Sequence, residues 1–121
     1  MNAQVLIVDD EIKLAEALRR LLREHDVVAT SDAAEALAWV AAGRRFDAIL
    51  SDVKMPLMSG VEFYSRLLQS CPEQAARVVF MTGGVTTPDE RTFVDAMGDR
   101  VLFKPATISQ VREHLARLLM R

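Results

Sequence analysis

Short apolar runs alternate along the chain with longer segments of helical periodicity, and this alternation is the strongest constraint on its fold. The runs lie at residues 5–8, 26–29, 47–51, 77–81 and 100–103. Between them, apolar residues recur every three or four positions, which is typical of one face of an amphipathic helix. Strands that alternate with helices favour a parallel sheet, because the helices are the crossovers that parallel neighbours need. The pattern therefore predicts an α/β fold, with five parallel strands covered by helices on both faces.

The expected helices follow from the same periodicity and from residues that begin or end helices. Pro72 is expected to end the third helix and Pro88 to open a short fourth one. The first helix is expected to turn Ile12 toward the core, together with Ala15, Leu18 and Leu22. The five predicted helices cover residues 12–22, a stretch from a cap at Ser31 or Asp32 to Gly43, residues 61–71, a stretch from Pro88 onward, and residues 108–119.

The length and charge of the chain exclude several classes of protein. A chain of 121 residues is expected to form one domain, residues 1–121. Its formal charge is −2, from 15 Lys and Arg against 17 Asp and Glu, which gives no reason to expect nucleic acid or an anionic membrane as a partner. The longest apolar run, residues 36–42, is far shorter than the ~20 residues that span a bilayer. The lone cysteine, Cys71, fits a reducing compartment, so we expect a cytoplasmic location.

Reactive side chains stand where four of the apolar runs end. Asp9 and Asp10 follow the first run, Asp52 the third, Thr82 the fourth and Lys104 the fifth. In open α/β sheets, ligands bind beyond the carboxyl ends of the strands, where the strand order reverses. With the strand order 2-1-3-4-5, that point lies between the first and third strands, which carry Asp9, Asp10 and Asp52. The sequence therefore predicts a site at this edge of the sheet.

Three carboxylates at one point repel one another unless a cation is present. A hard divalent ion relieves that repulsion, and Mg²⁺ typically takes one or two carboxylates together with water and phosphate oxygens. Lys104 adds a fixed positive charge and Thr82 a hydroxyl donor. Carboxylates, Mg²⁺, an ammonium group and a hydroxyl together indicate a site that handles a phosphoryl group.

Four segments together resemble the receiver domain of two-component response regulators, and the likeness extends over the whole chain. Each segment is weak evidence alone, whereas their order and placement at strand ends are highly specific. They are Val8-Asp9-Asp10-Glu11, the run from Asp52 to Gly60, Thr82-Gly83, and Lys104-Pro105. The resemblance implies a flavodoxin-like, doubly wound sheet of order 2-1-3-4-5 flanked by five helices. A softer likeness of residues 82–88 is to receivers attached to hybrid sensor kinases.

The resemblance implies that Asp52 is the phosphoacceptor of a phosphorelay. Its carboxylate would attack the phosphorus of a phosphohistidine on a histidine kinase or a histidine phosphotransfer domain. Asp10 would bind Mg²⁺ directly and Asp9 through water, with Asp52 and the backbone carbonyl of Lys54 as further ligands. The family varies at Lys54 and at Gly84, and this variation tunes the lifetime of the acyl phosphate.

Lys104 would pair with the phosphoryl oxygens, or with Asp52 before phosphorylation. Thr82 would hydrogen-bond the phosphoryl group and draw the loop from Gly83 inward. In the family, Lys-Pro at this place is usually cis, which we expect for Lys104-Pro105.

The resemblance also implies how the signal leaves the domain. Receivers commonly carry Tyr or Phe three residues before the lysine, and that side chain moves inward on activation. This chain has Val101 there, with Phe103 on the same side of the strand by period-two alternation. The usual contact surface of the family corresponds to residues 88–119, where a downstream protein would bind and where a homodimer would form.

Two other classes of protein are alternatives to a phosphoacceptor. Phosphatases that use a nucleophilic aspartate resemble Asp-x-Asp on the first strand and need a cap domain, whereas the nucleophile candidate here lies on the third strand of a short chain. A pseudo-receiver, which folds and binds partners without being phosphorylated, is favoured by Val101 and opposed by the presence of Asp9, Asp10, Asp52, Thr82 and Lys104. A receiver takes part in its own phosphotransfer and dephosphorylation and is not a classical enzyme.

Overall fold

The computed structural model describes residues 3–120. Its centre is a parallel sheet in the order β2-β1-β3-β4-β5, which confirms the predicted topology. In this sheet β1 lies between β2 and β3. The chain passes from β1 to β2 in one direction and then returns past β1 to β3, so the strand order reverses between β1 and β3. The strands are β1 (Gln4–Val8), β2 (Asp26–Thr30), β3 (Ala48–Asp52), β4 (Val78–Thr82) and β5 (Val101–Phe103).

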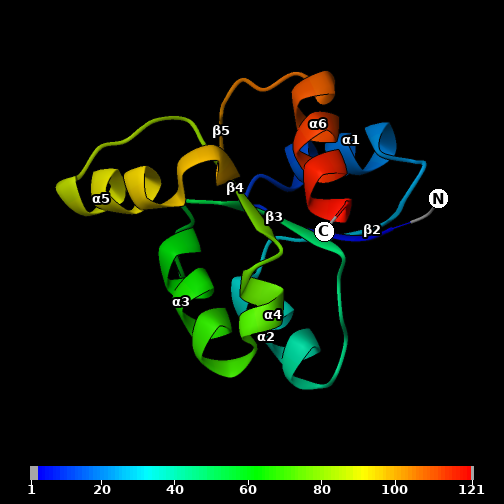
Figure 1. The fold of residues 1–121 in the computed structure, drawn as a ribbon, viewed down its shortest axis with the longest axis horizontal. Helices are drawn as coiled ribbons and strands as arrows, with labels where there is room; N and C mark the ends of the chain where they lie inside the picture. The colour runs from blue at the N-terminus through cyan, green and yellow to red at the C-terminus, as the bar shows by residue number, and fades with distance from the viewer. Residues whose placement is uncertain (1–2, 121) are drawn as a thin grey trace.

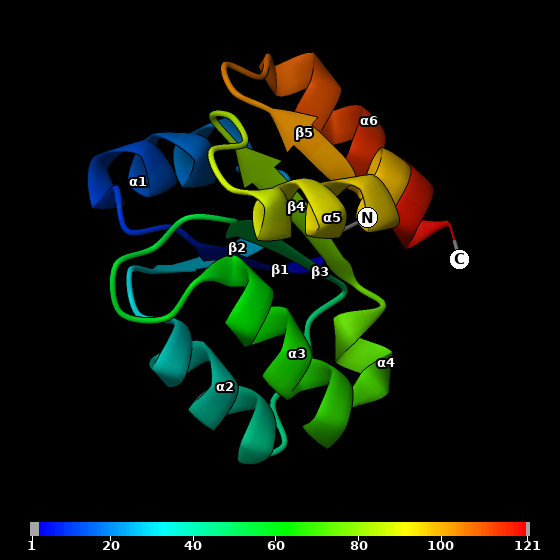
Figure 2. The same cartoon turned by 90° about the vertical axis from the view of Figure 1, so that its left-hand side faces the viewer.

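Helices cover both faces of this sheet. Figure 2 shows α1 and α6 on one side of the strands and α2, α3 and α4 on the other. In Figure 1, α5 reaches out beside β4 and β5, at the end of a long loop. Their bounds are α1 (Ile12–Leu21), α2 (Ala33–Ala41), α3 (Gly60–Ser70), α4 (Pro72–Ala75), α5 (Pro88–Met97) and α6 (Ile108–Leu119), with the 3₁₀ turn η1 (Gly98–Arg100) before β5.

Alternation along the strands divides the apolar side chains between two cores. In β3, Ile49 points into the core beneath α2, α3 and α5, and Leu50 into the core beneath α1 and α6. Every residue of β3 and β4 is buried, as expected for central strands covered on both faces. The first core includes Phe80, whose ring centroid lies 4.9 Å from that of Phe93 and 5.4 Å from that of Tyr64, so an aromatic cluster joins β4, α3 and α5.

Two expectations about the helices are corrected by the structure. Within residues 3–120 there are six α-helices, because Pro72 ends α3 and then opens the four-residue helix α4. Proline favours the first turn of a helix, where its missing N–H has no partner to lose. Ile12 was expected to face the core, but 46% of its surface is exposed, since it is the first residue of α1 and no preceding helical turn covers it. No helix among the described residues is long and apolar enough to cross a membrane.

Candidate functional site

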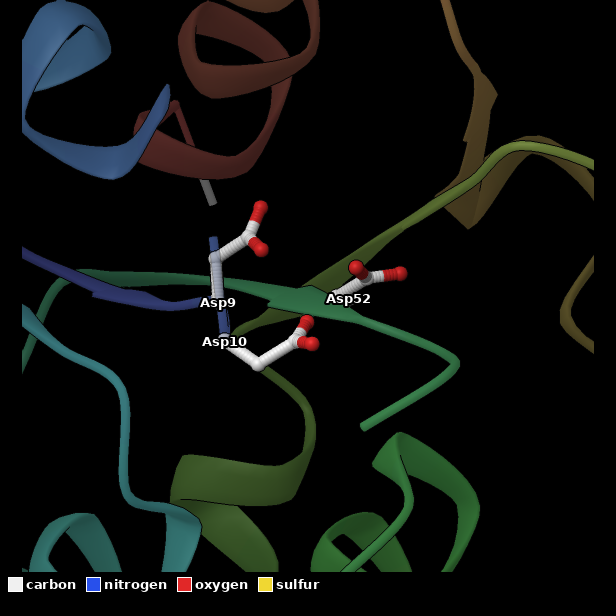
Figure 3. Close-up of side chains that lie close together, drawn as sticks. All are labelled: Asp9, Asp10 and Asp52. Carbon is white, nitrogen blue, oxygen red and sulfur yellow. The ribbon is translucent and has the colours of Figure 1, made fainter. Parts of the chain in front are cut away.

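Three carboxylates meet at the carboxyl ends of β1 and β3. One oxygen from each of Asp9, Asp10 and Asp52 lies within 4.8 Å of the others. Figure 3 shows the three side chains at the point where the two strands end. Asp9 and Asp52 are buried, whereas Asp10 is exposed. The predicted clustering at the reversal of strand order is therefore present.

Strand alternation explains which side chains reach this cluster. Asp9, Asp52 and Lys104 each lie two positions after a strand residue of the core beneath α1 and α6. Those core residues are Ile7, Leu50 and Leu102. Because side chains two apart point to the same face, the three charged groups project to one side of the sheet end. The Nζ atom of Lys104 lies 3.1 Å from Asp52 Oδ2 and 3.4 Å from Asp9 Oδ2.

The electrostatics of the cluster follow from burial and from this shared cation. Burial raises the pKa of Asp9, and the nearby charge of Asp52 raises it further, against the lowering effects of the Glu11 amide and of Lys104. Burial alone would lower the pKa of Lys104, but the charges of Asp52 and Asp9 outweigh it and raise that pKa. The site therefore holds a lysine that is firmly cationic beside carboxylates crowded enough to favour a second cation.

Backbone groups hold the two buried carboxylates in place. The N–H of Glu11 donates to Asp9 Oδ1 over 2.9 Å, and the N–H of Lys54 donates to Asp52 Oδ1 over 3.3 Å. Amide donors of this kind favour the ionised form of a carboxylate. Gly60 fits against the same backbone, since a Cβ atom there would collide with the carbonyl oxygen of Asp52. The glycine is thus required by the close return of the chain past the acceptor candidate.

Thr82 is buried at the end of β4, but its hydroxyl does not contact the carboxylates. It donates to the carbonyl oxygen of Gly84 over 2.8 Å, and it accepts from the N–H of Gly84 over 3.2 Å. Thr82 lies two positions after Phe80, which belongs to the other core, so its side chain starts from the opposite face of the sheet. Gly83 is exposed and Gly84 has φ +153, a conformation that side chains disfavour.

The remaining residues singled out in the sequence lie around β5. The Lys104-Pro105 peptide bond is cis, as the resemblance implies. Val101 is buried in the core that contains Phe80, and it has no aromatic ring to move. Phe103 is 55% exposed, so it leaves the core that Val101 occupies.

A polar network that no sequence pattern predicted lies next to Asp10. The Nζ atom of Lys54 donates to Thr86 Oγ1 over 2.8 Å and lies 3.6 Å from Glu90 Oε1. Glu90 and Lys54 line a cavity of about 390 Å³ together with Asp10. The sequence places Glu90 in the first turn of a helix that begins after Thr87, at Pro88. It does not indicate that Lys54 is the residue with which Glu90 pairs.

An apolar groove opens beside Lys104. It has a volume of about 400 Å³ and runs between α1 and the start of α6. Leu14 and Leu21 on its α1 side are 41% and 52% exposed. Asp9 and Lys104 lie at its charged end, so the groove adjoins the carboxylate cluster.

The carboxylate cluster fits a hard divalent cation. Its donors are oxygens of three carboxylates close enough to share one ion, and Mg²⁺ and Ca²⁺ prefer oxygen ligands. The donor set contains no sulfur or imidazole, which a softer metal would favour.

Comparison with known proteins gives a consistent family assignment. The family model described as the response regulator receiver domain matches residues 5–116. The response regulator MprA of Mycobacterium bovis is 31% identical over 123 residues, which cover 100% of this chain and 52% of MprA. The chain thus spans about half the length of that relative.

Solved structures agree with this assignment. The chemotaxis response regulator CheY4 of Vibrio cholerae is 32% identical, with a TM-score of 0.78 over 98% of this chain and 100% of that one. The receiver domain of the sensor histidine kinase PA1611 from Pseudomonas aeruginosa is 23% identical, with a TM-score of 0.79 over 100% of both chains, and it shares the fold. That structure is described with a magnesium ion coordinated in its active-site cleft.

Proposed function

Because this chain belongs to the response regulator receiver family, we propose that it is the phosphoacceptor of a two-component phosphorelay, with Asp52 as the acceptor. The observation that carries this proposal is the position of Asp52: the residue is 7% exposed, and its carboxylate lies beside two further carboxylates and contacts the Lys104 ammonium over 3.1 Å. This carboxylate lies at the carboxyl end of β3, and the groups that hold it, the Lys104 ammonium and the Lys54 N–H, carry no free electron pair with which to compete as nucleophiles.

The transfer begins with an oxygen of the Asp52 carboxylate attacking the phosphorus of a phosphohistidine. A P–O bond forms while the P–N bond breaks, and its electron pair stays on the imidazole, which is protonated as it leaves. Lys104 lies where its ammonium attracts the phosphoryl oxygens, and its raised pKa keeps it charged. The apolar groove beside Lys104 supports a protein donor, since it offers surface to a partner that reaches the acceptor.

Asp9, Asp10 and Asp52 would hold Mg²⁺, with the Lys54 carbonyl oxygen as a further ligand. When bound, the ion supplies positive charge that neutralises the cluster and the oxygens of the phosphoryl group. The magnesium described for PA1611 supports this choice of metal. The residues of this chain place two carboxylates in fixed orientations through the amides of Glu11 and Lys54.

The effect of phosphorylation would pass from the site to protein partners. Thr82 would exchange its bonds to Gly84 for a bond to the phosphoryl group, and the loop from Gly83 would follow. The downstream protein, or a second copy of the chain, would bind the face formed by residues 88–119. We further propose that residues 1–121 act as one receiver domain in the cytoplasm, with a histidine kinase or histidine phosphotransfer domain as donor.

One observation favours a pseudo-receiver as a second candidate. Val101 takes the place of the aromatic side chain that commonly moves on activation in the family, so this domain lacks that part of the switch. A pseudo-receiver would use the same face to bind partners without being phosphorylated.

The experiment that separates the two is the intact mass of the protein after incubation with acetyl phosphate and Mg²⁺. The wild-type protein should gain one phosphoryl group, and the metal-free sample and Asp52→Asn should gain none. Circular dichroism of Asp52→Asn controls for folding. A wild-type protein that gains no phosphoryl group from acetyl phosphate or from a phosphorylated histidine phosphotransfer domain would be a pseudo-receiver.

A further inference from the structure

A polar network links the acceptor loop to the start of α5. The Nζ atom of Lys54 donates to Thr86 Oγ1 and pairs with Glu90 Oε1. The same Glu90 oxygen accepts from the N–H of Thr86 over 2.9 Å and from its hydroxyl over 3.0 Å. The hydrogen bond from the Thr86 backbone is the main cause that lowers the pKa of Glu90, and the charge of Lys54 adds to it. One ammonium and one carboxylate therefore hold the loop between β4 and α5 at a single point.

The lysine in this network also contacts the acceptor. The N–H of Lys54 donates to Asp52 Oδ1, while its side chain reaches α5. Asp10 and Glu90 line the same cavity, with Lys54 as the cation among its lining residues. A change of charge at Asp52 therefore occurs next to the residue that pairs with Glu90.

The first half of α5 has little else to hold it. Among residues 88–92, Glu90 alone is not exposed, while the apolar residues of α5 that pack on the core lie in its second half. They are Phe93, Val94 and Met97. In Figure 1, the loop that leads into α5 arches away from the sheet before the helix begins. Besides Val85, which packs against the core from the loop before Thr86, the contacts of Lys54 and Thr86 with Glu90 are what hold this end of the helix.

We propose that Lys54, Thr86 and Glu90 form a tether that holds the start of α5 in the unphosphorylated protein and opens when Asp52 is phosphorylated. This inference rests on the proposed function. Phosphorylation replaces the single negative charge of the Asp52 carboxylate by the ~1.5 to 2 negative charges of a phosphoryl group, and it extends that charge outward beside Lys54. This added charge draws the Lys54 ammonium away from Glu90 and repels the Glu90 carboxylate. The Lys54 and Glu90 side chains are 41% and 20% exposed, and a pair this accessible is weak enough to be displaced.

The tether gives this domain a path from the acceptor to α5 that needs no aromatic side chain at Val101. It acts through charge at the surface of the site, whereas the common switch acts through a ring that enters the core. Lys54 and Glu90 are accordingly positioning residues for α5.

Amide hydrogen exchange measured by NMR tests the tether in the full chain. Thr86 is the direct probe, because its N–H donates to Glu90 Oε1. Glu90→Gln removes the charge but keeps an oxygen that accepts from Thr86. Asp89→Asn is the matched control, since it removes one exposed charge from the same first turn and has no contact with Lys54.

In the unphosphorylated protein, Glu90→Gln should speed exchange at Thr86 and its neighbours about two- to fivefold, and Asp89→Asn should leave it unchanged. Phosphorylation of the wild type with acetyl phosphate and Mg²⁺ should produce a similar increase, and it should add little in Glu90→Gln. Equal exchange in Glu90→Gln and the wild type would overturn the tether, as would an increase on phosphorylation of the same size in both proteins.

The intact mass of each sample records how much phosphoryl group it carries. If no sample gains one, the proposed function fails and the opening step fails with it. The tether itself is then decided by the comparison of unphosphorylated Glu90→Gln with Asp89→Asn. If the samples are phosphorylated and Thr86 exchange is unchanged, the proposed function stands and the tether is wrong.

Discussion

Lys104 supplies the positive charge that two buried carboxylates share. It lies 3.1 Å from Asp52 and 3.4 Å from Asp9, and both charges raise its pKa. A metal ion bound by the same carboxylates competes with this ammonium for their charge, while a phosphoryl group is attracted by both cations. The lysine should therefore oppose metal binding and favour phosphoryl transfer.

Replacement of Lys104 by Met separates these two effects. Lys104→Met should bind Mg²⁺ more tightly than the wild type, since the carboxylates lose a competing cation. It should take up phosphoryl groups from acetyl phosphate at least about tenfold more slowly, because a charge that stabilises the transferring group is gone. Titration calorimetry gives the first quantity and the time course of intact mass the second. Uptake at the wild-type rate would exclude Lys104 from the transfer.

Gly60 is required by packing against the acceptor backbone. In Gly60→Ala the new methyl group would displace the Asp52 carbonyl, so the free energy of unfolding should fall by about 1–3 kcal/mol. Gly83→Ala is the control, since a Cβ atom there meets nothing within 4 Å, and its stability should be unchanged or slightly higher. Urea denaturation measures both. Equal stability of the two variants would show that the loop moves aside without cost.

At the scale of the elements, apolar patterns predicted the fold well where burial decides the structure. β3 and β4 are buried at every position, and their short apolar runs, at residues 47–51 and 77–81, end one residue before the strands end at Asp52 and Thr82. The same patterns gave wrong predictions at the ends of helices. Pro72 breaks a helix in one context and begins one in another, and an apolar residue at the first position of a helix, such as Ile12, has no neighbouring turn to cover it.

Some residues of the candidate site could be predicted from the sequence, and others could not. Asp9, Asp52 and Lys104 could be brought together from the sequence, because strand ends and period-two alternation fix their positions once the strand order is assumed. The hydroxyl of Thr82 starts from the other face and bonds to Gly84, which alternation also explains once the strand is seen. The contact of Lys54 with Glu90 could not be found, because it depends on the path of the loop between β4 and α5, and no periodic pattern specifies that path.

Arg100 joins three elements near the opposite end of the sheet. Its Nε atom donates to the carbonyl oxygen of Val78 over 3.0 Å, its Nη2 atom donates to that of Ala75 over 2.6 Å, and its guanidinium lies over the Tyr64 ring. Arg100→Met should lower the free energy of unfolding by about 2 kcal/mol, since both carbonyl oxygens lose a charged donor.

Arg91→Met is the control for Arg100, because Arg91 forms an exposed pair with Asp95 on α5 and should contribute less than about 0.5 kcal/mol. Thermal and urea unfolding compare the two variants. An Arg100→Met protein as stable as Arg91→Met would mean that water replaces the lost donors.

At the scale of the whole molecule, a metal that relieves the carboxylate cluster should stabilise the fold. A ligand that binds only the folded state adds RT ln(1 + [L]/Kd), about 1.4 kcal/mol at a concentration ten times Kd. The melting temperature should therefore rise with Mg²⁺ in the wild type, and this rise should be much smaller in Asp10→Asn. An exposed acid outside the cluster, in Asp89→Asn, controls for general salt effects. The same rise in Asp10→Asn and in the wild type would place the metal elsewhere.

The chain spans about half the length of MprA, so the proposed function concerns the receiver domain and not the whole of such a relative. The proposed phosphoryl transfer would occur at one end of the sheet, and the proposed contact face at residues 88–119 includes α5, β5 and α6. We propose two routes from the acceptor toward that face: Thr82 with the loop that follows it, and the tether of Lys54, Thr86 and Glu90. Both begin within two residues of a strand end at the site.

The central claim is that Asp52 carries the phosphoryl group, and its most direct test is to identify the modified residue. Loss of phosphorylation in Asp52→Asn has two explanations, because the substitution removes the proposed acceptor and also one of the three carboxylates proposed to bind Mg²⁺. One oxygen from each of Asp9, Asp10 and Asp52 lies within 4.8 Å of the others, so the variant could lose the metal rather than the acceptor. Borohydride reduces an acyl phosphate to an alcohol, so peptide mass spectrometry of the reduced wild-type protein marks the acceptor. We predict homoserine at position 52 in the sample treated with acetyl phosphate and Mg²⁺, and unmodified residues at 9 and 10. Homoserine at position 9 or 10, with Asp52 intact, would contradict the account.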